Sequence, residues 1–182
     1  MRRGVLWGIG VVLLVGLAAS AEAKTYRSPY AGTAVVTSID SNGDGTPARE
    51  TIVQANTNLG GRALGRDVQE STPPVPAGPG ECEGLDLGAG LIVRSTLVSA
   101  WGVTTLQDGS QRFNRGDSGF TCVNATTGVV AGETQGTVVG GTGKWGAWTG
   151  PYTSKFRGQL LDPSTNIIAV SGETTGELTK AK

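Results

Sequence analysis

Apolar and polar residues alternate along most of this chain, and a period of two predicts β-strands rather than helices. β-Branched residues and glycines are frequent, and turn pairs such as Asp108 with Gly109 interrupt the alternation at short intervals. Short strands in hairpin order, with no helix between them, predict an all-β fold: a single antiparallel up-and-down barrel of about eight strands. The predicted segments are residues 33–39, 50–57, 62–71, 91–99, 101–106, 110–114, 119–124, 129–139, 152–160 and 167–178.

The first 23 residues do not follow this pattern. Two arginines precede an apolar run over residues 5–17, which ends before an Ala-Glu-Ala sequence at residues 21–23. A basic end, a short apolar run and such a site are typical of a secretory signal peptide, and the run is shorter than the ~18 residues of a membrane-spanning helix. We therefore expect residues 1–23 to be removed. Residues 24–182 are then expected to form one β-barrel domain that is secreted or periplasmic and not inserted in a membrane.

Charge and composition exclude several functions. The chain has 15 basic and 15 acidic residues and no basic cluster, which argues against nucleic acid or anionic lipid as the main partner. It contains no histidine, so the commonest general base and every Ser-His or Cys-His nucleophile pair are missing. The composition therefore favours a non-enzymatic protein without a required cofactor.

Two cysteines, Cys82 and Cys122, stand in a chain that is expected to enter an oxidising compartment. We predict that they form a structural disulfide. A redox pair or a metal site is the alternative, but there is no C-x-x-C spacing and no histidine to complete a zinc tetrahedron. The bridge would lie just beyond a Pro-rich loop at residues 72–80, in which the prolines disfavour sheet pairing.

Residues 140–150 carry five glycines between two predicted strands. The segment resembles a signature of the allene oxide cyclase–dirigent superfamily, in which Gly-Gly-Thr-Gly, a basic residue and an aromatic precede a final glycine. The matching residues are Gly140, Gly141, Thr142, Gly143, Lys144, Trp145, Thr149 and Gly150. The resemblance extends over roughly residues 90–160 and implies an eight-stranded barrel. Its motif carries no catalytic residue, so it implies the fold and not the activity.

Aromatic residues gather around this glycine-rich corner, and two interpretations stay open. A core plug is favoured because aromatic clusters mostly pack; the alternative is a pocket mouth for an apolar ligand. Arg94 lies in the strand predicted at residues 91–99. A charged residue there is expected on the solvent face, but facing inward it would orient an anionic or oxygenated ligand. The candidate ligand-binding residues are Arg94, Trp101, Trp145, Trp148 and Tyr152.

The loop at residues 40–46 contains oxygen ligands at alternate positions and a glycine at the sixth, as in a calcium loop. Its candidate ligands are Asp40, Asn42, Asp44 and the backbone of Thr46. The twelfth position holds Thr51 instead of a bidentate glutamate, so a polar hairpin turn is favoured over Ca²⁺ binding.

Three functions follow from these observations. We predict an exported, non-enzymatic barrel that binds an apolar small molecule or acts as an interaction module. The first alternative is a cyclase or isomerase in the manner of the enzymes that the chain resembles, which work by enclosing the ligand. The second is a calcium-stabilised extracellular structural protein. The resemblance also implies association into a homo-oligomer.

Overall fold

The computed structural model describes residues 22–40, 43–162 and 164–180. Within these ranges the chain is almost entirely β-structure, and no described helix is long and apolar enough to cross a membrane. The strands are β1 (Glu22–Val36), β2 (Arg49–Thr57), β3 (Gly61–Ser71), β4 (Val75–Pro76), β5 (Ile92–Leu106), β6 (Gln111–Asn124), β7 (Val129–Gly141), β8 (Trp148–Asp162) and β9 (Ile167–Lys180), with one 3₁₀ turn, η1 (Gly143–Trp145).

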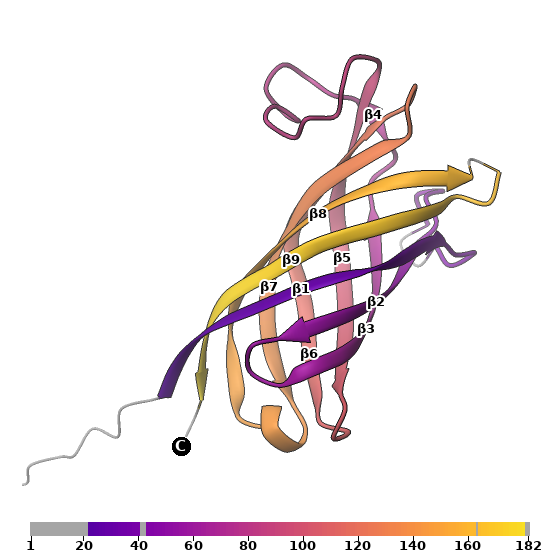
Figure 1. Cartoon of the computed structure of the whole chain (residues 1–182). Coiled ribbons are helices and arrows are strands. Elements are labelled where there is room, and N and C mark those ends of the chain that lie inside the picture. Colours follow the sequence, from indigo (N-terminus) through magenta and orange to yellow (C-terminus); the bar gives the residue numbers. More distant parts are fainter. Residues whose placement is uncertain (1–21, 41–42, 163, 181–182) are drawn as a thin grey trace, which may run out of the picture.

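Eight of these strands close into an antiparallel barrel (Figure 1). Consecutive strands pair as hairpins, β3 pairs with β5, and β1 pairs with β9 to close the ring. The short strand β4 lies outside the ring against β5. The predicted all-β, up-and-down barrel of about eight strands is therefore confirmed.

Several predicted boundaries differ from those of the structure. β5 and β6 each run without a break where the sequence pattern predicts two segments. β1 begins at Glu22, although Pro29 interrupts its sequence pattern. The pairing of β1 with β2 begins only at Tyr30, so the missing N–H of Pro29 falls beside an unpaired edge, where proline is tolerated. In the Pro-rich loop, Val75 and Pro76 nevertheless pair with β5.

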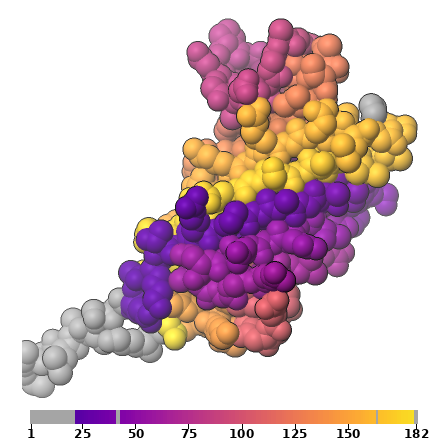
Figure 2. Space-filling view, in the orientation of Figure 1, coloured from indigo at the N-terminus to yellow at the C-terminus, as the bar shows by residue number. Residues whose placement is uncertain are grey.

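A disulfide joins Cys82 to Cys122, as predicted. Cys122 is fully buried between the outer face of β6 and the segment at residues 77–91, where it packs with Leu87 and Ala131. The side chain of Asn124 also holds this segment, because its amide donates to the carbonyl oxygens of Leu87 and Ala89, both at 3.0 Å. The segment stands at the β4 end of the barrel in Figure 1 and as the upper lobe in Figure 2.

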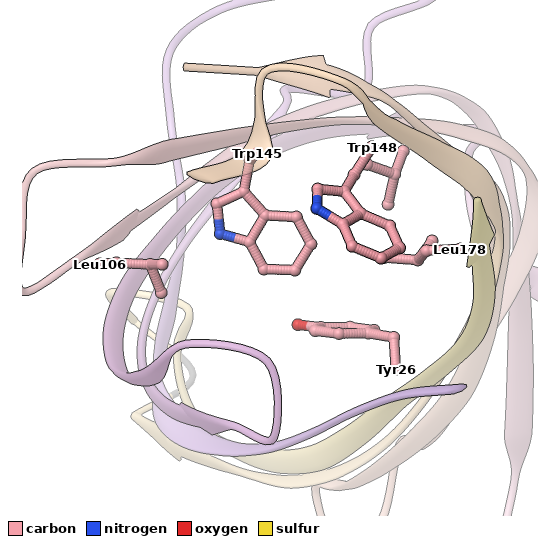
Figure 3. Close-up of a cluster of buried hydrophobic side chains, with 6 residues drawn as sticks. Tyr26, Leu106, Trp145, Trp148 and Leu178 are labelled. Carbon is pink, nitrogen blue, oxygen red and sulfur yellow. The ribbon is translucent and has the colours of Figure 1, made fainter. Parts of the chain in front are cut away.

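The glycine-rich corner between β7 and β8 closes the opposite end of the barrel. Gly140 and Gly150 have φ values of 130° and 145°, which glycine adopts without strain. The turn directs Trp145 and Trp148 into the barrel, where they are 2% and 8% exposed. They pack with Tyr26 and with the aliphatic side chains of this end, Leu106, Val138 and Leu178 (Figure 3). We call these six residues the plug.

Candidate functional site: the barrel cavity

The barrel interior beyond the plug is not filled. It contains a cavity of about 120 Å³ that takes wall residues from every strand of the ring. Its apolar wall comes largely from Ala34, Val53, Val130, Phe156, Ile168 and Val170. Its polar wall comes largely from Ser28, Tyr30, Arg49, Asp67, Thr104, Arg112, Asn114, Tyr152 and Ser154. The two kinds of wall make the cavity amphipathic.

Glycines opposite large side chains create this space. A Cβ added to Gly172 would lie 2.7 Å from the hydroxyl of Tyr30, and one added to Gly136 would lie 2.6 Å from that of Tyr152. The aromatic side chains therefore lie flat against neighbouring strands that carry no side chain at these positions. A barrel of eight strands has little interior volume to spare, and these glycines keep part of it open.

The polar wall has its origin in the alternation of β3. This strand turns Ala63, Gly65, Asp67 and Gln69 toward the interior and leaves Leu64 53% exposed on the outer face. The alternation is thus the reverse of the usual apolar-in pattern. As a result, a carboxyl group reaches the inside of the barrel.

Arg112 supplies a cation at the boundary between the plug and the cavity. Its guanidinium carbon lies 4.4 Å from the ring centre of Tyr26 and 5.6 Å from that of Trp145, so the charge rests on two aromatic faces. Its Nη2 donates to Thr104 Oγ1 at 2.9 Å. Its Nε and Nη1, and the Oδ1 of nearby Asn114, are buried without a hydrogen-bond partner in the part of the chain that the structure describes. Unpaired buried groups of this kind are costly to a folded protein.

Ionisable side chains from several strands lie close enough in the cavity to shift one another's pKa values. Burial raises the pKa of Asp67 to about 6, and the positive charge of Arg112 opposes that rise. Burial also raises the pKa of Tyr30 and of Tyr152, and the Asp67 carboxylate adds to both rises. Burial lowers the pKa of Arg49. Among the described cavity residues, Asp67 is therefore the group positioned to change charge near neutral pH.

The five predicted ligand-binding residues lie in three different places. Tyr152 lines the cavity, and Trp101 contributes to its wall although 58% of its surface is exposed outside. Trp145 and Trp148 belong to the plug. Arg94 lies on the outer face, because it pairs in register with Cys122 and its guanidinium carbon lies 5.2 Å from the ring centre of Phe120. Its Nη1 is 3.8 Å from a carboxylate oxygen of Glu81.

The cavity residues that sequence reasoning missed are mainly Arg49, Asp67, Arg112 and Asn114. The available signal was weak. Each lies in a strand at an alternate position to apolar residues, which usually means a solvent-facing side chain. Only the strand register, which aligns Asp67 with Gly102 and Gly102 with Asn114, brings these residues inside.

The predicted calcium loop has the hydrogen bonds of a polar turn. The Asp40 carboxylate accepts from the backbone N–H groups of Gly43 and Gly45, at 2.8 and 2.9 Å, and the Asp44 carboxylate accepts from that of Thr46 at 2.8 Å. Asn42 lies outside the described residues. In the part of the chain that the structure describes, no cluster of three His, Cys, Asp or Glu side chains is placed to hold a metal. Calcium binding by this loop, the less favoured interpretation of its sequence, stays an untested alternative.

Comparisons of the chain with known protein families, with curated proteins and with solved structures found no match. The resemblance to the allene oxide cyclase–dirigent superfamily accordingly stays a prediction.

Proposed function

We propose that this protein binds a small molecule inside its barrel and is secreted or periplasmic. The observation that carries the proposal is a cavity of about 120 Å³ in which apolar walls meet buried polar atoms that have no partner among the described residues. Pockets for small ligands typically combine a mostly apolar surface with a few convergent polar groups. The disulfide supports the proposed location, because such bonds persist mainly in oxidising compartments.

The size of the cavity limits the ligand. An engineered apolar cavity of roughly 150 Å³ takes up benzene. A cavity of about 120 Å³ therefore suits a molecule of about one ring, or a compact branched chain of similar volume, unless side chains move. The sequence pattern favours an apolar ligand. The polar wall narrows this class to an apolar molecule that also carries an oxygen-bearing group.

A second candidate function is a cyclase or isomerase that encloses a reactive molecule. One observation favours it: Asp67 has a pKa of about 6 and lines a cavity that it shares with Arg112 and Tyr152. Groups with pKa values near the working pH are suited to proton transfer, and enclosure limits the conformations of a bound molecule. Binding is common to both functions, so binding is the property to test first.

Native mass spectrometry of the chain, exported through its own N-terminal segment and purified without detergent, tests the proposal. We expect a species that carries extra mass of small-molecule size, which is lost on denaturation. The same spectrum reports the mass of the mature chain and the number of subunits. A bare mass after exposure to extracts of the producing cells, together with no uptake of benzene-sized probes, would overturn the proposal.

A further inference from the structure

Several polar groups of the cavity that lack a partner among the described residues lie together on the side nearest the plug. Arg112 and Asn114 stand two positions apart on β6, and both face the interior with their side chains 6% and 7% exposed. Asp67 approaches from β3, where it pairs with Gly102 of β5, and Gly102 pairs with Asn114. Two strands, β3 and β6, on either side of the glycine position of β5, thus direct a carboxyl group, a cation and an amide toward one region of the cavity.

These groups have unused hydrogen-bonding capacity of both kinds. Among the described residues, two buried nitrogen atoms of Arg112, Nε and Nη1, have no acceptor, and the Oδ1 of Asn114 has no donor. The Asp67 carboxyl makes no hydrogen bond or ion pair with any residue that the structure describes, although the positive charge of Arg112 opposes the rise in its pKa. A group that both donates and accepts a hydrogen bond is the simplest complement to such a set.

The charges decide between a neutral and an anionic partner. Asp67 and Arg112 carry opposite charges that already offset each other. A carboxylate next to Arg112 would place a second anion beside Asp67, and like charges in a buried site repel strongly. Arg49 is a further cation in the wall: it lies on β2 in register with Gln69, two positions along β3 from Asp67, but it is the charge of Arg112 that acts on the pKa of Asp67.

Resting on the proposed binding function, we propose that the ligand is a neutral, hydroxyl-bearing molecule whose hydroxyl group donates to Asp67 and lies beside Arg112 and Asn114. Its apolar body extends away from the plug along Val130, Phe156 and Ile168, which line the same cavity. Asp67, Arg112 and Asn114 are thus expected to favour binding of alcohols over hydrocarbons and over carboxylates of the same size.

Three probes of nearly equal size separate these possibilities: benzyl alcohol, toluene and benzoate. Each is titrated into the ¹⁵N-labelled purified chain at pH 7, and binding is read from the indole N–H signals of Trp145 and Trp148, which lie in the plug next to the cavity. The indole of Trp101, on the outer face, reports contact outside the barrel. We expect benzyl alcohol to bind at least about tenfold more tightly than toluene or benzoate, the usual worth of a hydrogen bond to a charged group.

The pH dependence identifies the acceptor. The ionisable groups that line the cavity with Asp67 are Arg49, Arg112, Tyr30 and Tyr152. Burial raises the pKa of both tyrosines above the ordinary value of 10, so neither ionises between pH 5 and 7. A hydroxyl group donates a stronger hydrogen bond to the ionised carboxylate of Asp67 than to its protonated form. Since the pKa of Asp67 is about 6, we expect affinity for benzyl alcohol to fall about tenfold from pH 7 to pH 5 while that for toluene stays constant.

Two variants and one control complete the test. Asp67→Asn is expected to abolish the pH dependence, and Asp67→Leu is expected to make benzyl alcohol and toluene bind equally. Asp117→Asn is the matched control, because that carboxylate lies on the outer face and accepts from Thr137 at 2.7 Å. Benzoate binding as tightly as the alcohol, or pH dependence that survives Asp67→Asn, would overturn the inference alone. Failure of all three probes to shift the plug signals would instead overturn the proposed function.

Discussion

Replacing Trp145 by alanine tests whether the glycine-rich corner stabilises the barrel as a plug. The indole is 2% exposed, lies 5.9 Å from the ring of Tyr26 in an edge-to-face arrangement and supports the guanidinium of Arg112. Truncation of a buried tryptophan to alanine costs about 3–5 kcal/mol, because apolar contacts are lost and a cavity remains. We expect a loss of about 4 kcal/mol in the free energy of unfolding.

Trp101 provides a control with the same chemical change on the outer face. It is 58% exposed, so Trp101→Ala is expected to cost about 1 kcal/mol or less. Equilibrium unfolding in urea, followed by far-UV circular dichroism, measures both losses without depending on indole fluorescence. Trp145→Phe should fall between wild type and Trp145→Ala and keeps the comparison usable if the alanine variant does not fold. Losses for the two alanine variants that agree within about 1 kcal/mol would refute the assignment of Trp145 to a plug.

The remaining predictions concern the disulfide, the buried carboxyl and the calcium loop. The double variant Cys82→Ala/Cys122→Ala should lose about 4 kcal/mol of unfolding free energy, because a bridge across 40 residues restricts the entropy of the unfolded chain. In urea titrations, dithiothreitol should destabilise the wild type but not the variant. The folded protein holds the proton of Asp67 more tightly than the unfolded chain, so ionisation destabilises it as pH rises from 3.8 through about 6. Asp67→Asn should therefore be up to about 3 kcal/mol more stable than wild type at pH 7 and equal to it near pH 4; a constant difference would contradict this sign. Backbone N–H groups already donate to the carboxylates of Asp40 and Asp44, so calcium at millimolar concentration should leave Tm unchanged. A rise in Tm that Asp44→Ala abolishes would instead identify a calcium site.

The sequence predicted the barrel because its signal is distributed over the whole chain. Alternation and turn pairs recur in every hairpin, so an error at one boundary does not change the topology. The errors arose where single residues contradict a strand. Pro29 concealed the first half of β1, and Ala100 stands in the part of β5 where two strands were predicted. Pairing with neighbouring strands, which no local pattern contains, overrides such interruptions.

The cavity residues could not be predicted because polar and apolar side chains occur on both the inner and the outer face of this barrel. Leu64 and Val68 lie on the outer face of β3 while Asp67 lies within. A period of two identifies two faces of a strand but does not say which of them is enclosed. Tyr152 was predicted as a ligand residue because of its place beside the glycine-rich corner, and it is the one predicted aromatic with its ring against the cavity glycines.

The closure of the ring by β1 and β9 has a consequence for how the barrel forms. Glu22 pairs with Lys180 and Ala34 pairs with Ile168, so the seam joins residues at the two extremes of the described chain. Contacts between residues so far apart in sequence form late and slow the folding of β-proteins, because a long loop has to be closed first. Hairpins can form one after another during synthesis, but the ring stays open until the final strand emerges. Formation of the seam between β1 and β9 is therefore expected to be a slow step in the folding of the barrel.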